Sequence, residues 1–208
     1  MSMPYLEFTC NRCGVKGDST VRWGRFSYEG RAGLIDVRRD VGWCSSCGAL
    51  APVETLPDRK AVQSLLTSIA EKVTVARDRK SAAMHGRSRR ARIFNASKHA
   101  REIAALDREV SYQEEALHEA NELLFFLEHR ESEARCLQCG ETDFRPLVFD
   151  ILPIGFLEQP GPPVPTETLH PGCGGRFQVQ HSGDSLMKVL SHRIYDREGR
   201  LLREEEDS

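Results

Sequence analysis

The chain has 208 residues, of which 29% are charged and 39% hydrophobic, and its net charge at pH 7 is −2. This composition excludes a disordered chain, because it supplies enough apolar residues for one or two folded domains. It also excludes a membrane protein, since the longest purely apolar run, residues 123–127, is too short to cross a bilayer. Residues 1–9 do not resemble a secretory signal, so we expect a cytoplasmic protein.

The first 56 residues contain two Cys-x-x-Cys pairs, at Cys10 and Cys13 and at Cys44 and Cys47. Short strand-like segments precede and follow these pairs. A two-residue spacer lets one tight turn present two thiolates to one ion, and two such turns complete the tetrahedron that zinc prefers. We predict that residues 1–56 form a zinc ribbon closed by these four cysteines.

Residues 57–133 have a helical composition, with a single glycine and no internal proline. Apolar residues recur at heptad spacing in both halves of this segment, from Leu66 to Ala83 and again from Ile103 to Leu127. Gly86 interrupts the first half. We therefore predict a long antiparallel helical hairpin, packed as a coiled coil, that turns near residues 84–90.

Charge is distributed unevenly along the predicted hairpin. Residues 72–101 carry ten lysines and arginines against the single acid Asp78, whereas residues 102–134 carry ten acids against two arginines. In a hairpin that turns near residue 88, the basic parts of both helices lie side by side at the exposed end. Arginine suits bidentate contacts with phosphate, so we predict nucleic-acid contacts at Arg87, Arg89, Arg90, Arg92, Arg79, Lys80, Lys98 and Arg101.

Two alternatives to this interpretation stay open. In a homodimer formed through the helical region, the basic segment of one chain would lie on the acidic segment of another, and no anionic partner would be needed. The other is a protein-binding adaptor, assembly factor or inhibitor that uses the ribbons and the coiled coil.

Residues 134–208 repeat the ligand pattern of the first 56 residues. Cys136 and Cys139 form the third pair, and His170 stands where a first cysteine would precede Cys173. Thirty residues separate the two halves of the pattern in both copies, which nominates His170 as a ligand, with His181 and His192 as the fallback. We predict a second zinc ribbon that contains a proline-rich loop, a closing hairpin at residues 194–202 and a frayed acidic tail.

The alternative to metal binding is disulfide or redox chemistry, but these pairs follow strands instead of opening a helix as in thioredoxin-like proteins. A glycine follows the second ligand of every pair, where a turn with positive φ is easily made. The pairs resemble the knuckles of the zinc-ribbon and rubredoxin-like groups. Four ligands leave no open position, so the prediction is two structural zinc ions per chain, with iron in the four-cysteine site as the minor alternative.

The predicted fold class is α+β, with two small β-rich zinc ribbons flanking a long helical hairpin. No phosphate-binding loop, nucleophile elbow or histidine-carboxylate motif is present, so we predict a non-enzymatic protein. The expected role is regulatory binding of nucleic acid or a nucleoprotein complex. In outline the chain resembles bacterial regulators that insert a coiled-coil hairpin into RNA polymerase, although those carry acids at the tip where this chain has arginines.

Overall fold

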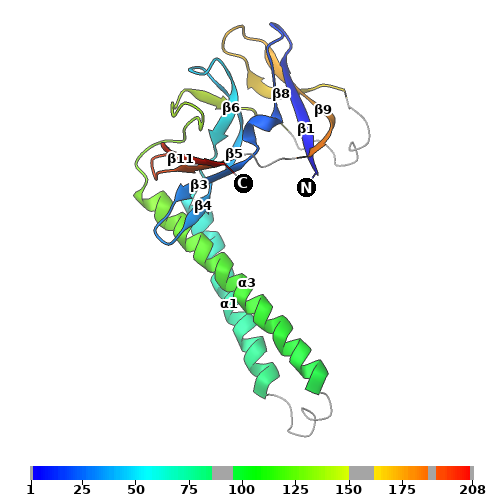
Figure 1. Cartoon of the computed structure of the whole chain (residues 1–208), viewed down its shortest axis with the longest axis vertical. Helices are drawn as coiled ribbons and strands as arrows, with labels where there is room; N and C mark the ends of the chain where they lie inside the picture. The colour runs from blue at the N-terminus through cyan, green and yellow to red at the C-terminus, as the bar shows by residue number, and fades with distance from the viewer. Residues whose placement is uncertain (1, 86–95, 150–161, 187–190, 207–208) are drawn as a thin grey trace. The chain divides into compact units, whose positions relative to one another are not determined.

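The computed structural model describes residues 2–85, 96–149, 162–186 and 191–206 (Figure 1). The chain divides into two compact units. Unit 1 comprises Met1–Leu56 together with Arg130–Ser208, and unit 2 comprises Pro57–His129. In the described residues, unit 1 contains three small sheets and unit 2 contains two helices, so the fold is α+β.

Sheet A joins the two ends of the chain. Its strand order is β2-β1-β9-β8, and its strands are β1 (Ser2–Cys10), β2 (Lys16–Asp18), β8 (Val164–Leu169) and β9 (Arg176–Leu186). In β1 the side chains of Leu6 and Phe8 are buried while Glu7 between them is exposed, which is the alternation of a strand with one covered face. β1 pairs antiparallel with β9, with Cys10 opposite Phe177.

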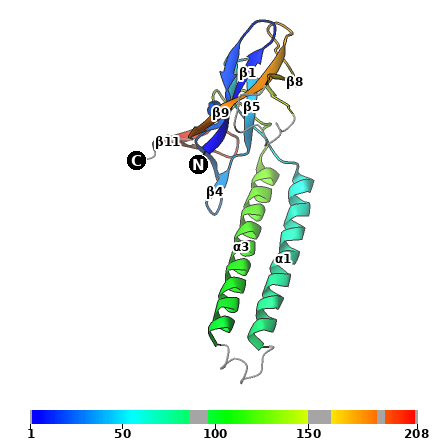
Figure 2. The same cartoon turned by 90° about the vertical axis from the view of Figure 1, so that its right-hand side faces the viewer.

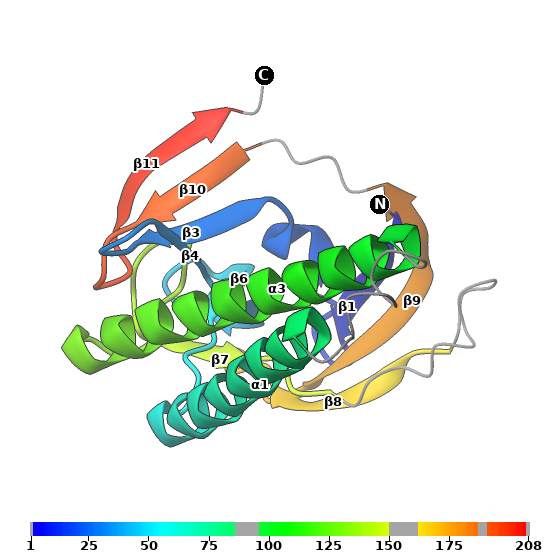
Figure 3. The ribbon, with the colours of Figure 1, turned by 90° about the horizontal axis from the view of Figure 1, so that it is seen from below.

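Sheet B also draws strands from both ends of the chain (Figure 3). Its order is β11-β10-β3-β4, and its strands are β3 (Arg25–Glu29), β4 (Leu34–Asp36), β10 (Ser191–Tyr195) and β11 (Leu201–Glu206). The rings of Phe26 and Tyr195 stack, with centroids 6.2 Å apart and an interplanar angle of 6°. A short 3-10 helix, η1 (Ser19–Arg22), leads into this sheet.

The end of the chain corrects one expectation. The hairpin predicted at residues 194–202 is confirmed: β10 and β11 pair antiparallel, and Gly199 in the turn has φ +75°. The acidic tail was expected to be frayed, but β11 continues as a strand through Glu206. Backbone pairing explains the difference, because the tail residues lie opposite β10, with Glu204 opposite Arg193 and Glu206 opposite Ser191.

Sheet C has the order β6-β5-β7, with strands β5 (Arg39–Cys44), β6 (Ala49–Glu54) and β7 (Phe144–Pro146). All three sheets therefore combine strands from before and after unit 2. The expectation that residues 1–56 and residues 134–208 each close a ribbon of their own is wrong. Each end supplies at most two strands to any one sheet, and pairing across the insertion completes the sheets.

The main core of unit 1 lies between sheets A and C. Phe8, Phe177 and Val179 of sheet A are fully buried and pack with Val41 and Trp43 of β5. Burying two aromatic rings and several aliphatic side chains contributes roughly 1.5–3 kcal/mol for each large side chain. This core holds the ends of β1, β5 and β9, from which the predicted metal ligands extend.

Unit 2 consists of α1 (Arg59–His85) and α3 (Ala96–His129), which lie side by side (Figures 1 and 2). α1 begins where predicted, because the carboxylate of Asp58 accepts a hydrogen bond from the N–H of Ala61 at 3.0 Å and caps the helix. Ile69, Val73 and Ala120 form a buried seam between the helices. The predicted turn falls mainly on residues 86–95, outside the described residues. Of the helices described, none combines the length and apolar content needed to cross a membrane.

Candidate metal centres

Four tight turns carry the eight predicted ligands, and their backbones have the same geometry. In each turn, which we call a knuckle, the N–H of the glycine after the second ligand donates to the carbonyl of the first ligand, at 2.8 to 3.0 Å. These glycines are Gly14, Gly48, Gly140 and Gly174, with φ between +62° and +80°. A side chain with a Cβ rarely adopts this conformation, so the predicted role of the four glycines is confirmed.

Sheet A brings two distant knuckles together. The first connects β1 to β2 and carries Cys10 and Cys13, and the second connects β8 to β9 and carries His170 and Cys173. Because β1 pairs with β9, the two knuckles lie at the same end of the sheet. Their four ligand atoms lie within 4.8 Å of one another. We call this group site A.

Sheet C assembles the second group in the same way. The turn between β5 and β6 carries Cys44 and Cys47, and the knuckle that precedes β7 carries Cys136 and Cys139. β5 pairs with β7 so that Cys44 lies opposite Phe144. The four sulfur atoms again lie within 4.8 Å of one another. We call this group site B.

The eight ligands are those predicted from the sequence, but the predicted pairing of knuckles is wrong. Cys10 and Cys13 were expected to share an ion with Cys44 and Cys47, and instead they meet His170 and Cys173. The physical reason is the strand pairing. β1 and β5 belong to different sheets, and each pairs with a strand that follows unit 2, β1 with β9 and β5 with β7. Each site therefore ties residues before unit 2 to residues after it.

The distances within both sites fit one tetrahedral ion each. In site A, the Sγ atoms of Cys10 and Cys173 are 3.4 Å apart, and Nδ1 of His170 lies 3.2 Å from the sulfur of Cys13 and 3.2 Å from that of Cys173. In site B, two sulfur–sulfur distances are 3.5 and 3.9 Å. Sulfur ligands around a tetrahedral zinc ion lie about 3.8 Å apart. All seven cysteines are free thiols, so the pairs are not disulfides.

Both sites contain a thiol whose pKa is lowered, Cys10 in site A and Cys139 in site B, and a thiol whose pKa is raised, Cys173 in site A and Cys136 in site B. Burial acts to raise the pKa of Cys10, but backbone N–H groups of Cys13 and Arg12 outweigh it and lower the pKa to about 6. In site B, burial raises the pKa of Cys136 to about 11. Burial also raises the pKa of Cys47, with further contributions from the neighbouring sulfurs of Cys139 and Cys44. Thiols with a raised pKa, such as those of Cys47 and Cys136, ionise at neutral pH when a cation binds beside them, and this arrangement therefore suits a cation.

Both sites are partly shielded from water. Cys44 and Cys136 of site B are fully buried and pack on Ala51. Trp43 precedes Cys44 in sequence, yet its ring lies edge-on to His170 of site A, with centroids 4.3 Å apart. The fallback ligands are not used, since neither His181 nor His192 belongs to either group. Every ligand position of both sites is filled by a side chain, as in structural metal sites.

The predicted nucleic-acid contacts fall into three classes. Arg87, Arg89, Arg90 and Arg92 lie outside the described residues. Lys98 and Arg101 are exposed on α3. Arg79 and Lys80 were expected to lie beside other cations, and this is wrong: their nitrogen atoms lie 3.7 and 2.5 Å from carboxylate oxygens of Glu109 and Asp107. At that level of α1, the acidic part of α3 faces the basic residues.

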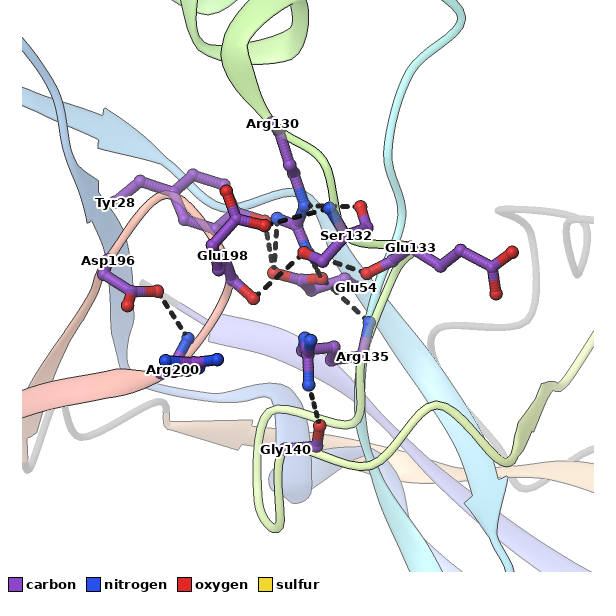
Figure 4. A network of polar contacts seen from close by, with 10 residues as sticks. All are labelled: Tyr28, Glu54, Arg130, Ser132, Glu133, Arg135, Gly140, Asp196, Glu198 and Arg200. Carbon is purple, nitrogen blue, oxygen red and sulfur yellow. Dashed lines mark hydrogen bonds and ion pairs between the residues drawn. The ribbon is translucent and has the colours of Figure 1, made fainter.

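Unit 1 contains a buried ion pair that the sequence does not predict (Figure 4). The side chains of Glu54 and Arg130 are 0% and 2% exposed, and the guanidinium of Arg130 donates to both carboxylate oxygens of Glu54, at 3.1 and 2.5 Å. The Tyr28 hydroxyl and the Arg135 backbone N–H also donate to this carboxylate, at 2.7 and 2.8 Å. A buried charge needs this density of partners.

This ion pair lies where the chain leaves unit 1 and where it returns. Glu54 is the last residue of β6, shortly before unit 2 begins, and Arg130 is the first residue after unit 2 ends. Arg130 also donates to the carbonyls of Ser132 and Glu133, at 3.1 and 2.9 Å. The backbone N–H of Ser132 donates to the carboxylate of Glu198 at 2.9 Å. The network therefore fixes the two attachment points of unit 2 close together.

No protein family, curated protein or solved structure matches the chain. The site residues and the charge distribution are therefore the basis for inferring function. Two four-ligand groups, both assembled across the insertion, are the features with the most definite chemistry.

Proposed function

We propose that this chain is a non-enzymatic zinc-binding protein in which two structural zinc ions hold unit 1 together. The observation that carries this proposal is the pair of four-ligand groups, with three thiols and one imidazole in site A and four thiols in site B. Thiolate and imidazole ligands favour zinc, and a filled tetrahedron leaves no position for a substrate. Structural zinc contributes on the order of 10 kcal/mol to the folding of small modules.

The metal content of the purified protein tests this proposal. We expect two zinc ions per chain by elemental analysis, and loss of both on chelation together with loss of the folded structure of unit 1. Substitution with Co²⁺ should give the absorption of a tetrahedral thiolate complex. Iron in site B, or a folded unit 1 that holds no metal, would contradict the proposal.

We further propose that α1 and α3 form an antiparallel hairpin whose end is basic. The ion pairs support this direction: Arg77 pairs with Glu114, whereas Lys80, further along α1, pairs with Asp107, earlier in α3. Between the paired residue Lys80 and Glu102 the sequence has no acid. The hairpin end therefore carries Arg87, Arg89, Arg90, Arg92, Lys98 and Arg101.

The proposed function of this end is to bind nucleic acid or a nucleoprotein complex in a regulatory role. If four arginines contact phosphates, the logarithm of the affinity for duplex DNA should fall with the logarithm of salt concentration at a slope of about −3 to −4. Substituting Arg87, Arg89, Arg90 and Arg92 together by alanine should reduce the magnitude of this slope by about 3 to 4. Lack of any binding to DNA or RNA at low salt would contradict the proposal.

One observation favours the alternative, a protein-binding adaptor, assembly factor or inhibitor. The ion pairs of Arg77, Arg79 and Lys80 neutralise part of the basic stretch and shorten the surface that attracts phosphate. A pull-down from nuclease-treated lysate, comparing wild type with the four-arginine variant, separates the two functions. A partner protein that is still retained after nuclease treatment, and that the four-arginine variant retains as well as wild type does, would support the adaptor.

A further inference from the structure

The two metal centres are alike in backbone geometry but differ in the charge around them. The segments that form site A, residues 8–17 and 169–180, contain Arg12, Lys16 and Arg176 and no carboxylate. The segments that form site B, residues 43–50 and 135–145, contain two arginines balanced by Glu141 and Asp143. The basic character therefore belongs to site A and is not a general property of the knuckles.

The strand register of sheet A places polar side chains in a row beside site A. Thr9 of β1 lies opposite Lys16 of β2 on one side and opposite Gln178 of β9 on the other. Residues opposite each other in antiparallel strands share a face of the sheet. Arg176 lies two residues before Gln178 and so shares the same face. The buried residues Phe8, Cys10, Phe177 and Val179 occupy the other face.

Two of the three cations are held in place by the knuckles. The guanidinium of Arg12 donates to the carbonyl of Cys173 in the opposite knuckle. Arg176 donates to the carbonyl of Thr166 at 3.1 Å, and its backbone N–H donates to the side chain of Asn11 at 2.9 Å. Each guanidinium has five N–H groups, so most of its donors stay free of these contacts. Both side chains are exposed and restrained by these hydrogen bonds, which lowers the entropy lost when a ligand binds.

The nearest acids on this face, Glu7, Asp18 and Glu167, mark the boundary of this surface. Glu167 of β8 is exposed and lies two residues before Leu169, which pairs with Arg176. Glu7 and Asp18 lie opposite each other, two residues further from the knuckles than Thr9 and Lys16, which is roughly 7 Å along the strands. The carboxylate of Asp18 accepts a hydrogen bond from the N–H of Thr20 at 2.8 Å and caps η1. The positive charges of this face therefore lie next to site A, and the negative charges lie further along the strands.

We propose that this surface, formed by Arg12, Lys16 and Arg176 with Thr9 and Gln178, binds the phosphate backbone of nucleic acid. The cations supply the charge that phosphate requires, and the threonine and glutamine side chains supply neutral hydrogen-bond donors. This inference concerns unit 1 and goes beyond the proposed role of the helical unit. It predicts two separate polyanion contacts in one chain.

Salt dependence of binding tests this surface in the full chain. The probes are a short DNA duplex and a short single-stranded RNA, and fluorescence anisotropy gives the affinity across a salt series. The test variant carries Arg12→Gln, Lys16→Gln and Arg176→Gln. The matched control removes the same charge from exposed arginines of unit 1 outside the knuckles, with Arg25→Gln, Arg38→Gln and Arg200→Gln. Every variant is first required to bind the wild-type number of metal ions.

Loss of up to three phosphate contacts should reduce the magnitude of the salt slope on the duplex by about 2 to 3 in the test variant, with little change in the control. An unchanged slope in the test variant, or an equal change in both variants, overturns the inference. The four-arginine variant of the helical unit distinguishes the two proposals. If the four-arginine variant loses all binding while the test variant binds as wild type does, the contact through the helical unit is supported and the contact beside site A is refuted. The reverse pattern supports the contact beside site A and refutes the contact through the helical unit.

Discussion

The buried ion pair at the attachment points of unit 2 makes a sharp prediction for Arg130→Met. The substitution removes the guanidinium but leaves the Glu54 carboxylate, whose side chain is 0% exposed, without a counter-charge. The Tyr28 hydroxyl and the Arg135 N–H would still donate to that oxygen pair, yet neither carries a compensating charge. Breaking one side of a buried pair costs about 3–5 kcal/mol, and we expect this loss in the free energy of unfolding.

Urea unfolding at a fixed excess of zinc measures this loss, because bound metal stabilises the folded state by mass action. Both tryptophans, Trp23 and Trp43, belong to unit 1, so their fluorescence reports on the unit that contains the pair. Adding Glu54→Leu to Arg130→Met should cost less than the sum of the two single substitutions, since neither charge is then left alone.

The matched control is Arg203→Met, which breaks two ion pairs, with Glu29 and Glu205, whose side chains are all 47% to 54% exposed. It should produce little measurable change, because surface pairs are screened by water and salt. A loss for Arg130→Met no larger than for Arg203→Met, or strictly additive single substitutions, would refute the role assigned to the buried pair.

Three further predictions concern the metal sites and the turns. Zinc binding at pH 7 should release more protons per ion from a variant that keeps only site B than from one that keeps only site A, because site B has four thiols where site A has three and an imidazole, and the pKa of Cys10 in site A is already lowered to about 6. Calorimetry in buffers of different ionisation enthalpy measures this. Gly140→Ala, at φ +80°, should weaken metal binding at site B and lower stability by about 1 kcal/mol, while metal titration should show site A unchanged. Gly199→Ala should destabilise unit 1 in thermal unfolding, since the new Cβ would lie 2.7 Å from a carboxylate oxygen of Glu54.

Features that depend on a few neighbouring residues were predictable from the sequence. The knuckles follow from the two-residue spacer and the glycine after the second ligand, and all four glycines have positive φ. The thirty-residue spacing nominated His170, which is the histidine that joins the cysteines. The helices follow from composition and heptad spacing, and Ile69, Val73 and Ala120 lie in the seam between them.

Features that depend on distant pairing were not predictable. The two copies of the ligand pattern have equal internal spacing, so the sequence favours closure within each copy, whereas the structure pairs knuckles across the insertion. Only the alignment of β1 with β9 and of β5 with β7 decides this, and single strands do not encode their partners. Glu54 and Arg130 look like ordinary charges at the ends of elements, because nothing local indicates that both are buried.

Counting the metal ions retained by two matched variants tests the cross-insertion pairing most directly. Both variants lose two knuckles through serine substitutions. One loses Cys10, Cys13, His170 and Cys173, and the other loses Cys10, Cys13, Cys44 and Cys47. Native mass spectrometry with excess zinc should find one ion in the first variant, where site B is intact, and none in the second, where each site keeps only two ligands. One ion in the second variant and none in the first would contradict the pairing.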